Sequence, residues 1–341
     1  MEKNRWLRIG VAIIVLFVLG VFLRLARPIL VPFAMALLFA FAVSPALDVL
    51  VRRKVPKSLA LTVILLLAFA VLYFIGTVFY AGGKSFAAEL PSYTEVVRSF
   101  LERIDEVVPD PRLKAGLTEW IGGFNISRAG AFVVTALGPF FGFMSDLFLV
   151  FLFMIFVLSG RGKTLRKLAV AFPPAQAERV TRTFARIDRE VQKYIAVKSL
   201  TNLLIGILVA AVLGIFGVRF AVVLGVLAFL FNYVPGLGAV VSVALPVLLA
   251  TFLEGTFSVG VAAILVLLSA VHLALHRLLE PRLMGRDGLH LSYVLVLFSL
   301  FSGAWLWGIP GMILAVPALT AARIVCDNVE SLRSVGELMD R

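Results

Sequence analysis

The residues whose types could do chemistry in this sequence lie within or beside long apolar stretches. Asp146 stands inside the apolar stretch 131–159, where a carboxylate is costly and is a candidate proton or cation carrier. His272 and His276 are one helical turn apart and precede Glu280, an order that could relay protons. Structural roles stay open beside these: a hydrogen-bonded or protonated acid at Asp146, and histidines that extend toward the membrane surface.

Uncharged polar residues form a second group. Asn232 and Tyr233 interrupt an apolar stretch, and Ser199, Thr201 and Asn202 precede them on a predicted helix. Such hydrogen-bonding groups suit a neutral polyhydroxyl ligand better than a bare ion, which prefers carboxylates or clustered carbonyl oxygens. Backbone carbonyls that are freed where a helix breaks keep an ion site open as well.

Several other kinds of site find no support in the sequence. The chain has one cysteine and three histidines, which leaves no internal disulfide and no Cys/His metal site. It has no phosphate-binding loop, nucleophile elbow or His-Glu-x-x-His motif, so neither ATP-driven pumping nor an intramembrane hydrolase is indicated. We therefore expect no enzyme activity, no cofactor and no metal centre.

The composition shows which elements must carry these residues. Hydrophobic residues make up 61% of the chain and charged residues 15%, and the mean hydropathy is +1.03. Soluble domains contain about a quarter charged residues, whereas the apolar stretches of this chain can cross the roughly 30 Å hydrocarbon core of a bilayer. The sequence therefore predicts an all-α polytopic membrane protein whose main partner is the lipid bilayer.

The placement of charges predicts an orientation in a bacterial inner membrane. Segment 161–198 carries ten basic and three acidic residues, whereas segment 84–128 carries six basic and seven acidic ones. Lys and Arg gather on the cytoplasmic side of membrane proteins, which places 161–198, the basic loop around Pro56 and both termini inside, and 84–128 outside. The same rule accounts for the net charge of +12 without a nucleic-acid partner.

Two apolar stretches in the second half of the chain, 221–252 and 289–325, are broken near their middles. The breaks contain Pro235, Gly236 and Gly238 in the first stretch and Pro310 and Gly311 in the second. If each stretch returns to its own side, the basic residues between them fall in the cytoplasm, as the charge rule requires. The prediction is about eight membrane segments, including two Pro/Gly-tipped re-entrant hairpins in an inverted repeat; ordinary spans kinked by proline are the alternative.

Two polar segments show the periodicity of amphipathic helices. Apolar residues recur at helical spacing over 97–108 in the outer segment and over 180–195 in the basic segment. The basic helix is typical of one that lies on the anionic inner leaflet, with partner binding or subunit contact as the alternative. A loop is expected from His276 to Gly288.

The predicted division of the chain follows from these features. It consists of N-terminal spans 1–83, outer amphipathic helices 84–128, a spanning helix 129–160, the cytoplasmic basic helix 161–198, a helix with the first hairpin 199–256, a helix with the second hairpin 257–325 and a cytoplasmic tail 326–341.

The second half of the sequence contains several distinctive motifs: FNYVPGLGA at 231–239, PVLLA at 246–250, LEPRLMGR at 279–286, GLH at 288–290 and LAVP at 314–317, with Gly303, Gly308 and Gly311. In these motifs the sequence resembles the autoinducer-2 exporter family of bacterial membrane transporters. The resemblance is specific over residues 193–325, and the sequence departs from the family pattern at 291, where Leu stands in place of Pro. The resemblance implies homo-oligomers, including a pentamer, and relatives that export autoinducer-2 or resemble sodium or lithium/proton antiporters.

We expect a secondary transporter that exports a small polar metabolite or signal by alternating access. The predicted solute-binding and hinge residues are Asn232, Tyr233, Pro235, Gly236, Gly238, Glu280, Pro310 and Gly311, and the candidates for proton or ion coupling are Asp146, His272 and His276. Two alternatives stay open: an antiporter that exchanges a monovalent cation, sodium or lithium, for protons, and a non-transporting membrane scaffold.

Overall fold

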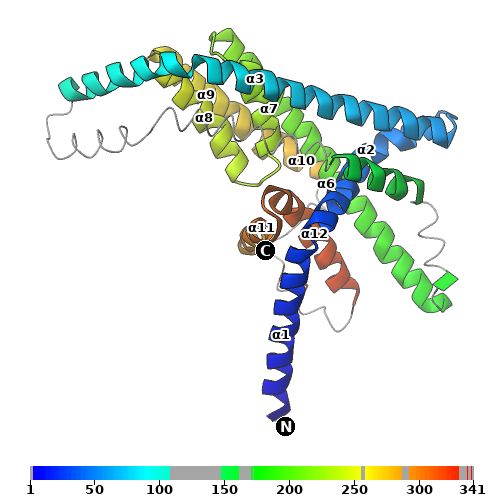
Figure 1. Cartoon of the computed structure of the whole chain (residues 1–341). Helices are drawn as coiled ribbons and strands as arrows, with labels where there is room; N and C mark the ends of the chain where they lie inside the picture. Colours follow the sequence, from blue (N-terminus) through cyan, green and yellow to red (C-terminus); the bar gives the residue numbers. More distant parts are fainter. Residues whose placement is uncertain are drawn as a thin grey trace. The chain divides into compact units, whose positions relative to one another are not determined.

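The computed structural model describes residues 3–107, 147–160, 170–171, 173–254, 258–285 and 292–329, together with 336 and 339. Within these ranges every regular element is a helix (Figure 1). In chain order they are α1 (Lys3–Leu25), α2 (Arg27–Arg52), α3 (Lys57–Val107), α6 (Pro174–Ile215), α7 (Ala221–Phe231), α8 (Leu237–Glu254), α9 (Val259–Ala274), the π-helical turn η1 (Leu275–Leu279), α10 (Glu280–Met284), α11 (Tyr293–Trp307) and α12 (Ile309–Asn328). A further apolar helix covers Leu147–Gly160.

Large apolar side chains project from these helices. Phe17, Phe22, Phe148, Phe298 and Phe301 are between 60% and 71% exposed. Leaving one such side chain in water instead of burying it costs about 1.5–3 kcal/mol, so these helix faces require an apolar environment such as lipid. Five of the described helices are long and apolar enough to cross a bilayer, and the all-α polytopic prediction is confirmed. The re-entrant depth of the hairpins stays a prediction.

The chain forms two compact units, each assembled from segments that are distant in the sequence. Unit 1 comprises Met1–Leu65, Asp146–Val197 and Met284–Arg341, and unit 2 comprises Leu66–Ser145 and Lys198–Leu283. The boundaries at 65/66 and 197/198 fall inside α3 and α6, so each of these helices contributes to both units.

The two longest helices join segments that the sequence treats as separate. α6 is 42 residues long and continues from the basic segment into the next apolar stretch, because no proline or glycine occurs between 175 and 205. α3 is 51 residues long and reaches the predicted outer segment.

The apolar stripe of the basic segment packs into unit 1. Val191, Tyr194 and Ile195 of α6 are buried in one cluster with Leu38 of α2 and Val316 of α12. This end of the stripe, which was expected to face the inner leaflet, therefore serves packing within the chain.

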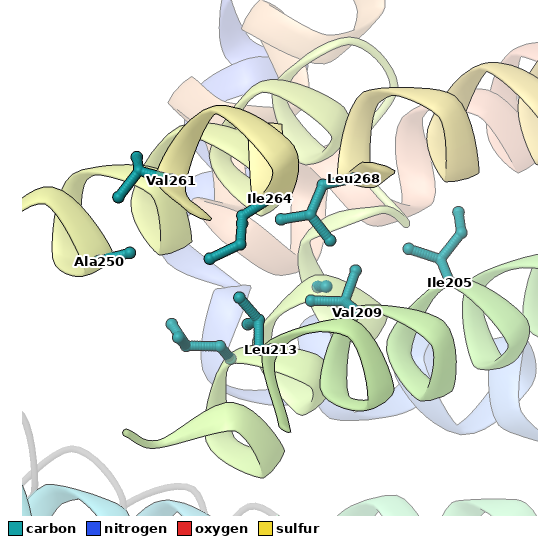
Figure 2. Packing of buried hydrophobic residues seen from close by; sticks show 9 residues of the cluster. Ile205, Val209, Leu213, Ala250, Val261, Ile264 and Leu268 are labelled. Atoms are coloured by element: carbon teal, nitrogen blue, oxygen red, sulfur yellow. The ribbon is translucent and has the colours of Figure 1, made fainter. Parts of the chain in front are cut away.

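The core of unit 2 is apolar and joins four helices. Its buried members are Ile205, Val209 and Leu213 of α6, Leu224 and Ala228 of α7, Ala250 of α8, and Val261, Ile264 and Leu268 of α9. Val209 and Leu213 point from α6 toward Ile264 and Leu268 (Figure 2). All six members of this core on α6 and α9 are no more than 1% exposed, so these two helices are held along a shared buried face.

Both predicted breaks interrupt helices. α7 and α8, which are 11 and 18 residues long, pack on each other in unit 2. α11 and α12, which are 15 and 20 residues long, pack on each other in unit 1. The chain thus forms two helical hairpins, whose tips lie at residues 232–236 and at Gly308.

Candidate functional site

Polar side chains continue the buried faces of α6 and α9 beyond the apolar core of unit 2. Toward the start of α6, the buried face changes from Ile205 to Asn202, Thr201 and Lys198, which are 0%, 0% and 6% exposed. On α9, the buried face ends with the polar residue His272. Burying a polar group is unfavourable unless it finds partners, so this change of polarity marks a candidate site.

Lys198, His276 and Glu280 form what we term the charged cluster. Lys198 Nζ donates to Glu280 Oε1 at 3.0 Å and to Oε2 at 3.2 Å. His276 Nδ1 lies 2.7 Å from Glu280 Oε2. The side chains of Lys198 and Glu280 are only 7% and 17% exposed, so each charge depends on the other for the solvation that it loses on burial.

Asn232 connects the charged cluster to the tip of the first hairpin. Its Nδ2 donates to the Ala228 carbonyl at 2.7 Å and to Ser242 Oγ at 2.8 Å. Because a carbonyl oxygen only accepts, these contacts determine the orientation of the amide. Asn232 Oδ1 therefore faces His276 Nε2, at 3.0 Å. A chain of hydrogen bonds runs from the charged cluster to α8.

Residues of α6 hold the remainder of this tip. With its amide nitrogen donating to the Lys198 carbonyl at 3.2 Å, Asn202 accepts from the Tyr233 N–H at 3.1 Å. The Tyr233 hydroxyl donates to Ser199 Oγ at 2.8 Å. The uncharged polar residues of the sequence thus bind one another across the tip, and their amides and hydroxyls keep capacity for further hydrogen bonds.

Glycines shape the backbone at the same tip. Gly236 adopts a φ of 79°, a left-handed conformation that strains any residue with a Cβ. A Cβ at Gly238 would overlap the carbonyl of Phe231, so glycine lets α8 begin against the end of α7. Pro235 is half-buried between them and contributes no backbone donor.

A π-helical turn joins α9 to α10 and carries His276. The Glu280 N–H bonds to the Leu275 carbonyl, five residues earlier. Pro281 follows, and its ring is incompatible with an ordinary α-turn over the Arg277 carbonyl, whereas the wider turn accommodates it. The helix therefore continues to Met284, and the expected loop from His276 is wrong up to that residue. Single π-turns of this kind occur frequently at functional sites.

Two buried polar atoms of unit 2 have no hydrogen-bond partner among the described residues: Thr201 Oγ1 and His272 Nε2. His272 Nδ1 lies 2.9 Å from the Leu268 carbonyl, so Nδ1 carries the proton of a neutral ring and Nε2 is an acceptor. The His272 and His276 ring centroids are 6.0 Å apart. Buried groups normally have partners, and both atoms are candidates to contact a bound ligand.

The second tip, in unit 1, is built from close backbone packing. Gly303 of α11 and Gly311 of α12 touch, and a Cβ on either would overlap the carbonyl of the other. Pro310 lies in the first turn of α12, where its missing N–H leaves no bond unmade. Trp307 Nε1 donates to the Leu23 carbonyl at 3.0 Å, which satisfies a carbonyl in the last turn of α1.

Comparison with known proteins shows the family of this chain. The model of the family described as "AI-2E family transporter" matches residues 11–331. The chain belongs to the AI-2E transporter family. This AI-2E family member is accordingly a multi-span membrane transporter.

The similarity to individual relatives extends over almost the whole chain. Proteins named "Putative transport protein" in Haemophilus influenzae and Borreliella burgdorferi are each 29% identical over 324 residues, which cover 94% of this chain and 92% and 87% of those proteins. "AI-2 transport protein TqsA" of Escherichia coli K12 is 27% identical over 324 residues, with 93% of this chain and 91% of that protein covered.

The predicted site residues of this AI-2E family member separate into distinct places. Asn232, Tyr233, His276 and Glu280 come together in unit 2, with His272 one turn from the charged cluster and with Pro235, Gly236 and Gly238 at the same tip. Pro310 and Gly311 belong to the second hairpin, in unit 1. Asp146 lies outside the described residues.

Sequence reasoning missed Lys198 and Ser242. The charge rule assigns Lys198 to the cytoplasmic surface, yet its spacing of four from Asn202 and seven from Ile205 places it on the buried face of α6. That spacing was the available signal. Ser242 offers none, because a single serine in an apolar helix usually satisfies itself on the preceding turn.

Proposed function

We propose that this protein is a secondary transporter that exports a small polar metabolite or signal across the bacterial inner membrane by alternating access. The observation that carries the proposal is the group of buried polar side chains in unit 2, where the charged cluster meets Asn202, Asn232 and Tyr233 at a broken hairpin. Inside a membrane a polar solute must exchange its hydrogen bonds to water for bonds to protein. Broken helices at mid-membrane sites provide such bonds.

The chemistry of these buried polar side chains favours a solute with several hydroxyl groups. Amides and hydroxyls both donate and accept, and Thr201 Oγ1 and His272 Nε2 have no protein partner among the described residues. A relative is named an AI-2 transport protein. Autoinducer-2, a small furanosyl signal, is therefore the first solute to test.

A sodium or lithium/proton antiporter is the second candidate, and the presence of Glu280 in a membrane segment favours it. The geometry ranks it lower. Both Glu280 oxygens already accept from Lys198, whose ammonium lies 3.0 Å away and repels any additional cation at this carboxylate.

Transport by inverted membrane vesicles that contain the full chain tests the proposal. Energised vesicles should accumulate labelled autoinducer-2 above vesicles without the protein, and Asn232→Ala should reduce the initial rate about tenfold, which corresponds to loss of one well-made buried contact. Asn328→Ala is the matched control, because that amide donates to the Ile324 carbonyl on α12 of unit 1. Its uptake should equal that of the parent.

Other outcomes assign the alternatives. Equal uptake by Asn232→Ala and the parent would show that these buried polar side chains are not the solute site. Proton flux driven by sodium or lithium gradients, measured with an internal pH dye and without autoinducer-2 uptake, would establish the antiporter. If a correctly assembled protein shows neither of these activities, the result favours the membrane scaffold.

A further inference from the structure

The imidazole of His276 lies between two hydrogen-bond acceptors. Its Nδ1 is 2.7 Å from Glu280 Oε2, and its Nε2 is 3.0 Å from Asn232 Oδ1. The Asn232 amide nitrogen already donates to the Ala228 carbonyl and to Ser242, so the amide oxygen is the atom that faces His276. An amide oxygen accepts hydrogen bonds and cannot donate. A neutral imidazole has one N–H and one lone pair, so it cannot donate in both directions.

The second acceptor is a carboxylate with both oxygens engaged. Lys198 Nζ donates to Oε1 and Oε2 of Glu280, at 3.0 and 3.2 Å. These contacts favour the ionised carboxylate, and all contacts are then satisfied when His276 is an imidazolium. Moving the shared proton from Nδ1 to Glu280 leaves the number of bound protons unchanged. These heavy-atom contacts are therefore all satisfied by a cluster that binds one proton more than a neutral histidine beside an ionised glutamate.

We propose that His276 is a proton-binding site whose proton ties the charged cluster to the tip of the first hairpin and so couples proton transfer to solute movement. The inference rests on the proposed function, to which it adds the coupling ion. It concerns a different step from solute recognition, because the proton is held between η1 and the hairpin rather than by the solute.

The proton step can be written atom by atom. The Nε2–H bond of the imidazolium breaks, its electron pair stays on Nε2, and the proton passes to water on the side to which the site is open. Nδ1–H is retained because a carboxylate is the stronger acceptor. The formal charge of Lys198, Glu280 and His276 together falls from +1 to 0, and the Nε2 lone pair then faces the Asn232 oxygen. That contact becomes repulsive and releases the tip, and proton uptake restores it.

The titratable groups around His276 do not provide an alternative site for the proton on Nε2. They are Lys198 of α6, Glu280 of α10, His272 of α9 and Tyr233 at the tip. Among these described groups, Glu280 alone shares a hydrogen bond with His276; the hydroxyl of Tyr233 donates to Ser199, and Nδ1 of His272 faces the Leu268 carbonyl. Histidine is also the side chain that ordinarily changes charge near neutral pH.

Nuclear magnetic resonance of the ring nitrogens tests proton binding directly and independently of transport. The chain has three histidines, so ¹⁵N-histidine labelling of the full protein in lipid nanodiscs gives few imidazole signals, and His276→Gln identifies those of residue 276. We expect both nitrogens to be protonated at the acidic end of a pH series and the Nε2 proton alone to be lost at its basic end. A neutral ring with a single N–H throughout the series overturns the proposal.

Thiol labelling tests the link to the hairpin. In a Cys326→Ser background, Leu237→Cys places a thiol at the exposed start of α8, next to the tip. The rate of reaction with a polar thiol reagent, divided by the rate in the same protein carrying His276→Gln, should rise about fivefold with pH, as expected for loss of one hydrogen bond. Thiol ionisation cancels in this ratio.

The matched control is His272→Gln, the same substitution one turn earlier, on α9. In a protein that carries this substitution, the ratio of labelling rates should still rise with pH. A ratio that does not change with pH overturns the coupling of the proton to the tip. Failure of the unsubstituted protein to transport autoinducer-2 bears instead on the proposed function, because neither the resonance nor the labelling measurement depends on that solute.

Discussion

Lys198 and Glu280 keep each other charged in an apolar unit. The carboxylate accepts two contacts from the ammonium and one from His276, and two of the three side chains are largely shielded from solvent. Because a buried ion requires a partner, removal of one member costs more than removal of the pair. The cluster is thus a unit whose members must be tested together.

Lys198→Met should lower the free energy of unfolding by about 3–5 kcal/mol, because it leaves Glu280 buried without its cationic partner. The double variant Lys198→Met/Glu280→Gln should recover a large part of the loss, although it should not recover transport. Thermal unfolding in detergent and vesicle uptake measure the two effects. A double variant no more stable than Lys198→Met would contradict the pairing argument.

Thr201→Val separates solute contact from structure. The Thr201 hydroxyl is buried and has no partner among the described residues, so its replacement by the isosteric valine should leave stability unchanged or raise it by at most about 1 kcal/mol. Initial uptake of autoinducer-2 should fall about fivefold if the hydroxyl contacts the solute, the equivalent of one hydrogen bond.

Thr62→Val provides the comparison for that substitution. Thr62 is exposed on α3 and donates to the Ser58 carbonyl, so uptake should remain at the level of the parent. Unchanged uptake in Thr201→Val as well would exclude its hydroxyl from the solute site.

At the scale of elements, the two hairpins are closed by different forces. The first tip is bound by side-chain hydrogen bonds from α6 and η1. The second is closed by direct backbone contact between α11 and α12 at Gly303 and Gly311. Small residues permit this approach in membranes, where packing rather than the hydrophobic effect holds helices together.

Gly311→Ala should destabilise the protein by at least about 1–3 kcal/mol, because the added Cβ meets a rigid carbonyl on the partner helix. Gly214→Ala, on α6, is the matched control: no atom lies within 4 Å of a Cβ at that position, and helix propensity favours alanine by about 1 kcal/mol. Unfolding midpoints in detergent should fall for the first variant only. Equal midpoints would show that the hairpin adjusts without loss.

At the scale of the whole molecule, each compact unit draws on segments from distant parts of the sequence. α3 and α6 cross the boundary between the units in sequence. The charge pattern predicts an orientation in which both termini and the loop after α2 are cytoplasmic and segment 84–128 is outside.

Cysteine labelling in oriented vesicles tests this topology. In a Cys326→Ser background, a membrane-impermeant maleimide should label Ser92→Cys in right-side-out vesicles and Arg53→Cys in inside-out vesicles, because basic loops stay in the cytoplasm. Labelling of both positions after permeabilisation is the control for reactivity. The reverse pattern would invert the proposed orientation and with it the direction of transport.

Hydropathy and the Pro/Gly breaks determine the membrane class, the helices and the two interrupted stretches from the sequence alone, because they act through neighbouring residues and the bilayer. Asn232, His276 and Glu280 could be singled out as polar exceptions in apolar stretches for the same reason. Tertiary structure alone decided that Lys198 binds Glu280, a residue 82 positions away. It also decided that the Asn232 oxygen lies within hydrogen-bond distance of His276, which is 44 positions away. Hydrogen-bond partners at such separations depend on which helix faces meet, and the local pattern does not contain that information.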